Sequence, residues 1–125
     1  MKGMKVLIAE EEIGVAKLLD VLMKQRGCET DIVADGAQAV ELAREAHPDL
    51  ILLDLMMPIR DGVDVLDELR QDPGTAQIPV VVLTTDETID QLPDPAMAHV
   101  TKPFAPKGLR AAVQQALLPD AQAAG

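Results

Sequence analysis

Three short runs of consecutive aliphatic residues stand out along the chain, at residues 6–9, 50–53 and 80–83. Runs without polar alternation are typical of strands that are covered on both faces by helices. A weaker run at residues 30–34 alternates more between apolar and polar positions, which favours a strand near the edge of a sheet. Residues 98–101 are a short fifth candidate. The pattern therefore predicts five strands.

Between these runs, apolar residues recur at the three- and four-residue spacing of helices that bury one face. The repeats cover residues 13–25, 37–46 and 63–71, and a last one extends over residues 109–117. A glycine or a proline follows each repeat within a few residues, and both residue types commonly end helices. Strands and helices alternate, which predicts an α/β fold: a parallel sheet with right-handed crossovers and helices on both faces.

One crossover departs from this pattern. Residues 86–97 (DETIDQLPDPAM) should hold the fourth helix, but they contain Pro93 and Pro95. Proline is poorly tolerated inside a helix and disfavours helical geometry in the residue before it. The sequence therefore predicts a fourth helix shortened to about two turns, over residues 87–92, followed by an irregular loop.

The length of 125 residues fits one domain that closes its own core. We assign residues 1–119 to the domain and residues 120–125 to a short C-terminal tail. The core must be aliphatic, because Phe104 is the only aromatic residue. Cys28 is the only cysteine, which excludes an internal disulfide, and it is expected to be a small buried thiol.

Charge narrows the classes of partner. The formal net charge is −10, with 21 acidic against 11 basic residues, so phosphate backbones and anionic membranes would repel this domain. We therefore expect no direct binding of nucleic acid by this domain and no membrane association. No apolar run approaches the length of a membrane span, and no signal peptide precedes the first strand, which favours a cytoplasmic location.

The candidate site residues come directly after the predicted strands in the sequence. In an open parallel sheet, ligands bind beyond the carboxyl ends of the strands. Acidic residues 10–12 follow the first predicted strand, Asp54 the third, residues 84–86 (TTD) the fourth, and Lys102 with Pro103 the fifth. Several carboxylates, a hydroxyl and an ammonium at one edge are typical of a site for a phosphoryl group and a hard divalent cation such as Mg²⁺. A carboxylate in such a site can act as a nucleophile and form an acyl phosphate.

These motifs carry a family resemblance. The acidic cluster, the D-x-x-M-P-x-x-D-G run from Asp54 to Gly62, the residues 83–85 (LTT) and the residues 102–104 (KPF) occur in the order seen in response-regulator receiver domains of two-component signalling systems. The resemblance covers roughly residues 4–118. It implies a flavodoxin-like five-stranded parallel sheet with strand order 2-1-3-4-5.

The resemblance also implies roles for the acidic residues. Asp54 would accept a phosphoryl group from a histidine kinase or a phosphotransfer protein. Glu10 and Glu11 would hold Mg²⁺ together with Asp54 and the main-chain carbonyl of Met56. Phosphorylation would then switch a surface that binds a downstream protein target, so the implied function is that of a signalling switch and not of an enzyme.

Four further roles are implied by the same resemblance. Lys102 would pair with the phosphoryl oxygens, and the bond before Pro103 is a candidate cis peptide. Thr84 would move to hydrogen-bond the phosphoryl group. His99 stands where the family usually has an aromatic residue that follows the threonine inward. Thr85 competes with Thr84 for its role, and His99 fits a half-buried structural histidine equally well.

Three departures from the family pattern stand out, and the first two support a rival hypothesis. Glu11 is one methylene longer than the usual aspartate, and Mg²⁺ demands tight octahedral geometry. The fourth helix is shortened, and His99 replaces an aromatic residue. The alternative is a degenerate receiver that acts as a phosphorylation-independent protein-interaction module. A flavin protein or phosphatase on a similar scaffold is disfavoured, since no glycine-rich loop follows the first strand. The chain is either a stand-alone protein or the N-terminal part of a longer regulator.

Overall fold

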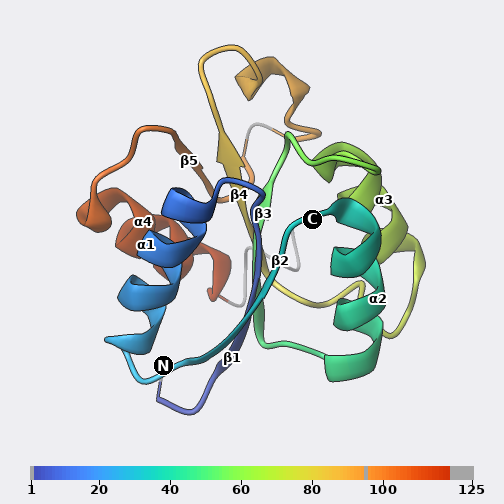
Figure 1. The fold of residues 1–125 in the computed structure, drawn as a ribbon. Coiled ribbons are helices and arrows are strands. Elements are labelled where there is room, and N and C mark those ends of the chain that lie inside the picture. The colour runs from blue at the N-terminus through green and yellow to red at the C-terminus, as the bar shows by residue number, and fades with distance from the viewer. Residues whose placement is uncertain (1, 95, 119–125) are drawn as a thin grey trace.

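The computed structural model describes residues 2–94 and 96–118. Strands and helices alternate along the chain, as predicted (Figure 1). The order is β1 (Lys5–Ala9), α1 (Ile13–Lys24), β2 (Glu29–Val33), α2 (Gly36–Ala46), β3 (Leu50–Asp54), α3 (Gly62–Gln71), β4 (Val80–Thr84), η1 (Ile89–Gln91), β5 (His99–Thr101) and α4 (Pro106–Ala116).

The five strands form one parallel sheet in the order β2-β1-β3-β4-β5. This confirms the predicted architecture and the predicted strand order. β2 is an edge strand, as its alternating pattern indicated, and none of its residues is fully buried. β3 is the central strand, and all five of its residues are buried. Its last residue is Asp54, so the acid belongs to the strand itself and not to the loop after it.

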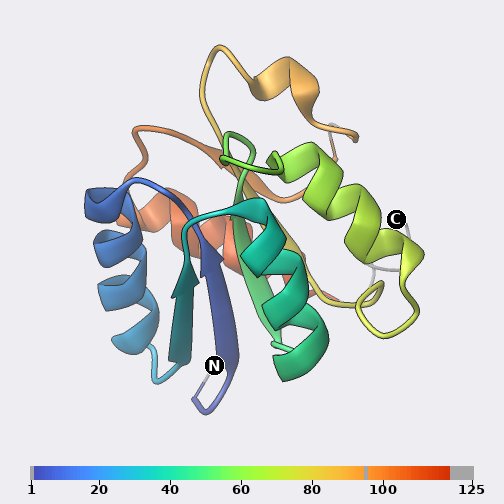
Figure 2. The same ribbon diagram turned by 45° about the vertical axis from the view of Figure 1, so that its right-hand side comes forward.

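Helices cover both faces of the sheet. Figures 1 and 2 show α1 and α4 on one side and α2 and α3 on the other. Successive residues of a strand point to opposite faces, so a strand covered on both sides must be apolar throughout. In β1, Val6 and Ile8 join the core under α1 and α4, whereas Leu7 and Ala9 join the core under α2 and α3. This explains the continuous aliphatic runs.

Two Asp-Gly pairs start α2 and α3. Asp35 Oδ1 accepts a hydrogen bond from the backbone N–H of Gln38 at 2.8 Å, and Asp61 Oδ1 accepts one from Asp64 at 2.9 Å. A side-chain acceptor of this kind satisfies a free N–H in the first turn of a helix. Glycine follows in each case because there is no room for a side chain. A Cβ at Gly62 would lie 2.4 Å from the carbonyl oxygen of Asp54.

The fourth crossover is shorter than predicted. The expected two turns over residues 87–92 are replaced by a single 3₁₀ turn, Ile89–Gln91. The side chains of Thr85 and Thr88 explain this difference. Thr88 Oγ1 accepts from the backbone N–H of Thr85 at 2.9 Å, and Thr85 Oγ1 accepts from that of Thr88 at 3.2 Å. Such local side-chain bonds compete with helical ones.

Cys28, the membrane-spanning potential of the helices and the C-terminal boundary were also subjects of prediction. Cys28 is buried, as predicted, with 6% of its surface exposed. In the part of the chain that the structure describes, no helix combines the length and apolar character needed to cross a bilayer. The predicted boundary at residue 119 and the tail 120–125 lie outside the described residues, so both stay predictions.

Candidate functional site

The carboxyl ends of the strands bring polar side chains together at one end of the sheet. Glu10 directly follows β1, Asp54 ends β3, Thr84 ends β4 and Lys102 directly follows β5. The main-chain N–H of Lys102 donates to the carbonyl of Thr84 at 2.7 Å, which fixes the start of the β5–α4 loop against β4. Residues far apart in the sequence therefore meet because their strands are parallel and adjacent.

Lys102 lies between the acidic residues. Its Nζ is 2.5 Å from Glu10 Oε1, donates to Asp54 Oδ2 at 3.1 Å, and is 3.8 Å from Glu12 Oε1. The Lys102 side chain is 13% exposed, while those of Glu10 and Asp54 are 0% and 7% exposed. A buried ammonium facing buried carboxylates balances charges that none of these residues could keep alone in the interior.

Burial shifts the proton affinity of this cluster. The pKa of Glu10 rises from 4.5 to about 7, chiefly because burial disfavours the ionised form and because the Asp54 carboxyl lies beside it. Contact with Lys102 acts in the opposite direction. For Lys102, burial lowers the pKa, but the contacts with Glu10 and Asp54 outweigh burial, and the net pKa is raised. Lys102 is therefore firmly protonated.

The Asp54 carboxylate is oriented by its own loop. Oδ1 accepts a hydrogen bond from the backbone N–H of Met56 at 3.0 Å. The loop that follows returns to the strand, because the N–H of Gly62 donates to the carbonyl of Leu55 at 2.8 Å. Both ends of the D-x-x-M-P-x-x-D-G run are thus attached to the end of β3. The loop holds one carboxylate oxygen and leaves the other facing Lys102.

Thr84 is buried beside β5. Its Oγ1 donates to the carbonyl of Val100 at 3.3 Å and lies 3.3 Å from Oγ1 of Thr101. Thr85 is engaged elsewhere, in the reciprocal bonds with Thr88. Of the two threonines that the sequence offered, Thr84 is the one whose main chain is bonded to Lys102.

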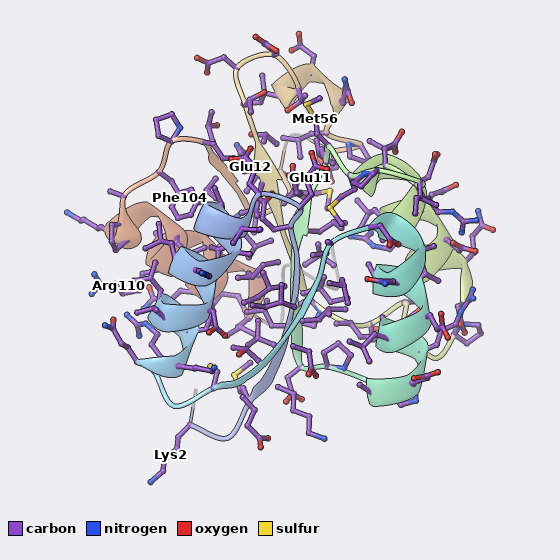
Figure 3. All side chains as sticks on the ribbon, viewed as in Figure 1. Lys2, Glu11, Glu12, Met56, Phe104 and Arg110 are labelled. Carbon is purple, nitrogen blue, oxygen red and sulfur yellow. The ribbon has the colours of Figure 1, made fainter. Side chains whose placement is uncertain are left out.

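Two other predicted site residues lie at this end of the domain but at the surface. Figure 3 shows Glu11, Glu12 and Met56 at the same end of the molecule. Glu11 is exposed, and no ion pair joins it to another described residue. The Met56 side chain is also exposed, at 55%, which leaves its main-chain oxygen as the atom of interest. The Lys102–Pro103 peptide bond is cis, the isomer that the family resemblance implies.

His99 lies away from the cluster. It is the first residue of β5 and pairs with Val82, two residues before Thr84 in β4. Its Nδ1 is 2.8 Å from the carbonyl oxygen of Met97. The structure therefore places His99 at the other end of β5 from Lys102, half-buried, and its role as a switch residue stays a prediction.

Two contacts of the cluster were not predicted from the sequence. Glu12 entered only as part of the acidic run 10–12, without a role of its own, yet its largely exposed carboxylate lies 3.8 Å from Lys102 Nζ. Thr101 was treated only as part of a strand, yet its hydroxyl contacts Thr84. The sequence signal for Thr101 is its position directly before Lys102, at the same strand end as Thr84.

The ligand types suit Mg²⁺. This cation prefers oxygen ligands and keeps several waters, so two carboxylates and one main-chain carbonyl are sufficient protein ligands. Glu10 Oε1 is buried, and its contact with Lys102 is electrostatic, since no hydrogen-bond donor reaches it in suitable geometry among the described residues. Residues 2–94 and 96–118 contain no group of three acidic, histidine or cysteine side chains poised to bind a metal. The fit therefore relies on Glu10, Asp54, a main-chain oxygen and water.

Comparison with known proteins identifies the family. The sequence matches the response regulator receiver domain over residues 6–114. It is 38% identical over 117 residues to the DNA-binding response regulator MtrA of Mycolicibacterium paratuberculosis, which covers 90% of this chain and 51% of that protein. It is 35% identical to the probable transcriptional regulator ycf27 of Cyanophora paradoxa, with 90% and 48% covered. The chain spans about half the length of the curated relatives it matches.

Solved structures agree with the fold. The chemotaxis response regulator CheY4 of Vibrio cholerae superposes with a TM-score of 0.83 at 26% identity, covering 93% of this chain and all of that one. The receiver domain of the sensor histidine kinase PA1611 of Pseudomonas aeruginosa gives a TM-score of 0.80 at 26% identity, with 90% and 96% covered. The latter structure is described with a magnesium ion in its active-site cleft. These likenesses confirm the predicted flavodoxin-like receiver fold, and the chain belongs to the response regulator receiver domain family of two-component signalling.

Proposed function

We propose that this domain accepts a phosphoryl group on Asp54 from a histidine kinase or a phosphotransfer protein in the cytoplasm, with Mg²⁺ as cofactor. The observation that carries the proposal is the position of Asp54: its carboxylate ends the central strand and shares the ammonium of Lys102 with Glu10. Phosphorylation would then change the surface presented to a downstream protein target.

The chemistry follows from the atoms around Asp54. A carboxylate oxygen attacks phosphorus, and the bond between phosphorus and the imidazole nitrogen of the donor histidine breaks, which leaves an acyl phosphate on Asp54. The N–H of Met56 fixes the plane of the carboxylate by holding Oδ1. Lys102, 3.1 Å from Oδ2, offers positive charge where the phosphoryl oxygens would arrive.

Glu10, Asp54 and the carbonyl of Met56 would hold Mg²⁺, with Glu11 contributing through water because its side chain is longer than aspartate and exposed. The cation would supply further positive charge at the equatorial oxygens of the phosphoryl group. In the structure, Lys102 pairs with both Glu10 and Asp54. Once Mg²⁺ shared these two carboxylates, Lys102 would pair with the phosphoryl oxygens.

Thr84 is the proposed link between the acceptor and the rest of the domain. Its hydroxyl has only weak bonds to give up, at 3.3 Å to Val100 and Thr101. A phosphoryl oxygen is a stronger, charged acceptor. Movement of Thr84 towards it would shift the segment that follows β4, and we propose that His99 responds to the space left behind. This proposal for His99 rests on its place in β5, one residue before Val100.

Intact mass after incubation with acetyl phosphate and Mg²⁺ tests the proposal. We expect a gain of one phosphoryl group that is lost in Asp54→Asn and retained in Asp67→Asn, a control on the exposed surface of α3. If the wild-type mass does not change at millimolar Mg²⁺, the proposal is wrong. The comparisons give no support to the alternative of a phosphorylation-independent interaction module, and the same measurement would detect it.

A further inference from the structure

Beside α3, which lies with α2 on one side of the sheet (Figure 2), there is a groove of about 740 Å³. It is bounded by α3, by the residues that lead into β4, by those that lead into β5, and by Gln115 and Ala116 at the end of α4. A parallel crossover normally places a helix over the sheet. Within the described residues, the β4–β5 connection is the one crossover without an α-helix, so a stretch of this face lacks its cover.

The floor of the groove is apolar. Val63, Ile78 and Met97 line it, and each is half-buried and packed against the core beneath α2 and α3. Apolar side chains that are packed from below and open from above are typical of surfaces that bind a partner. The floor therefore presents the kind of surface that a missing helix would bury.

The borders of the groove are strongly acidic. Residues 62–71 and 86–97 together contain seven acids and one base, for a charge of −6 out of the total of −10. The seven acids are Asp64, Asp67, Glu68, Asp86, Glu87, Asp90 and Asp94, and the base is Arg70. Asp64, Asp67 and Asp94 line the groove itself together with Arg70, so acids outnumber the base there by three to one. Negative charge thus flanks the apolar floor on both sides.

We propose that this groove binds a cationic amphipathic helix of a partner protein. An apolar stripe on the partner would cover Val63, Ile78 and Met97, and lysine or arginine residues on its flanks would face the acidic borders. α3 has ten residues and so is about 15 Å long, which matches a partner helix of about three turns. The inference goes beyond phosphorylation of Asp54 and does not depend on it.

The charges favour this occupant over a second copy of the chain in the same groove. Two copies meeting through this face would bring two sets of acidic borders together, and like charges across an interface oppose association. An anionic peptide or lipid would be repelled for the same reason.

The test uses the whole chain without phosphate or Mg²⁺, so that its outcome is independent of the acceptor site. The probe is an 18-residue peptide of leucine and lysine with leucines at helical spacing. Two control peptides are a permuted peptide of the same composition without a single apolar face, and a version with glutamate in place of lysine. We expect saturable shifts of the methyl resonances of Val63, Ile78 and Met97 with the first peptide only.

Charge reversal on α3 provides the matched variants. Asp64→Lys combined with Asp67→Lys should weaken peptide binding about tenfold. Glu41→Lys combined with Glu45→Lys makes the same change of charge on the exposed face of α2, outside the groove, and should weaken binding much less. Equal weakening by both pairs, shifts confined to other residues, or no saturable binding would overturn the proposal. Sedimentation showing dimers, with the groove methyl resonances dependent on chain concentration, would overturn it in favour of a second copy.

Discussion

We expect one methyl group at Gly62 to lower the stability of the domain and to displace Asp54, the proposed acceptor. A Cβ at this position would lie 2.4 Å from the carbonyl oxygen of Asp54 and 2.6 Å from the Cα of Leu55. Ordinary contact begins at 3.4 Å, and both neighbours are backbone atoms that cannot rotate away. The start of α3 and the end of β3 must therefore separate by about 1 Å.

The cost of this separation can be estimated. Overpacking in a well-packed region typically costs about 1–3 kcal/mol, and contacts between backbone atoms belong at the upper end, so we expect Gly62→Ala to lower the free energy of unfolding by about 3 kcal/mol. A displacement of the Asp54 backbone also moves the carboxylate relative to Lys102. Because positioning errors of this size reduce reaction rates steeply, phosphorylation by acetyl phosphate should slow by at least about tenfold.

Urea denaturation followed by far-ultraviolet circular dichroism measures the first effect, since the chain has no Trp or Tyr to report by fluorescence. Gly108→Ala is the matched control. It also adds one methyl group within a helix, but it meets no atom within 4 Å and should stabilise the domain by about 0.5–1 kcal/mol. A Gly62→Ala variant as stable as wild type, and phosphorylated at the same rate, would refute the reasoning about close approach.

Three further predictions concern the cluster at the strand ends. The pKa of Glu10 is about 7 in the folded domain against 4.5 ordinarily, so the folded state binds this proton more tightly and the contribution of Glu10 to stability falls as the pH rises through 7. Lys102→Met removes the ammonium that lowers this pKa; unfolding free energies between about pH 5 and pH 8 should then fall more steeply than in wild type. Glu11→Asp should tighten Mg²⁺ binding about tenfold in an NMR titration, because a shorter side chain suits compact octahedral geometry. Thr84→Val should cost about 1 kcal/mol in urea denaturation and should reduce the NMR shifts that a beryllofluoride mimic causes in residues 85–97.

The first two of these predictions have matched control variants. Lys107→Met removes an exposed lysine that forms no ion pair with another described residue, and its pH dependence should match wild type. Glu41→Asp shortens an exposed glutamate on α2 and should leave Mg²⁺ affinity unchanged. An unaltered pH slope in Lys102→Met, an unaltered Mg²⁺ affinity in Glu11→Asp, or full beryllofluoride shifts in Thr84→Val would contradict the respective role.

The sheet could be predicted from the sequence because its buried strands are continuous runs of apolar residues. Residues 50–53 are apolar without a break, and in a run this short that pattern favours a strand between two helical layers. The meeting of Glu10, Asp54, Thr84 and Lys102 followed from the same reasoning, since the ends of neighbouring parallel strands share one edge. The position of each strand end could be predicted because the apolar run of each strand stops there.

Details that depend on the reach of side chains were not predictable in this way. Whether the exposed Glu12 carboxylate comes within reach of Lys102 depends on the angle at which α1 leaves β1, and no periodicity encodes that angle. The fourth crossover was predicted to be short because of its prolines, but the reciprocal bonds of Thr85 and Thr88 shortened it further. Local hydrogen bonds of this kind compete with a helix at nearly equal energy, so the outcome depends on context.

The central place of β3 has a consequence for how a signal would leave the acceptor. β3 is hydrogen-bonded on both sides, to β1 and to β4, and every one of its residues is buried. A strand so enclosed resists displacement more strongly than the loops around it. One such loop is the β4–β5 connection after Thr84, where one 3₁₀ turn takes the place of a helix. The proposed acceptor thus ends the most enclosed strand of the sheet, and strain created at Asp54 would be relieved in the loops beside β3 and not in β3 itself.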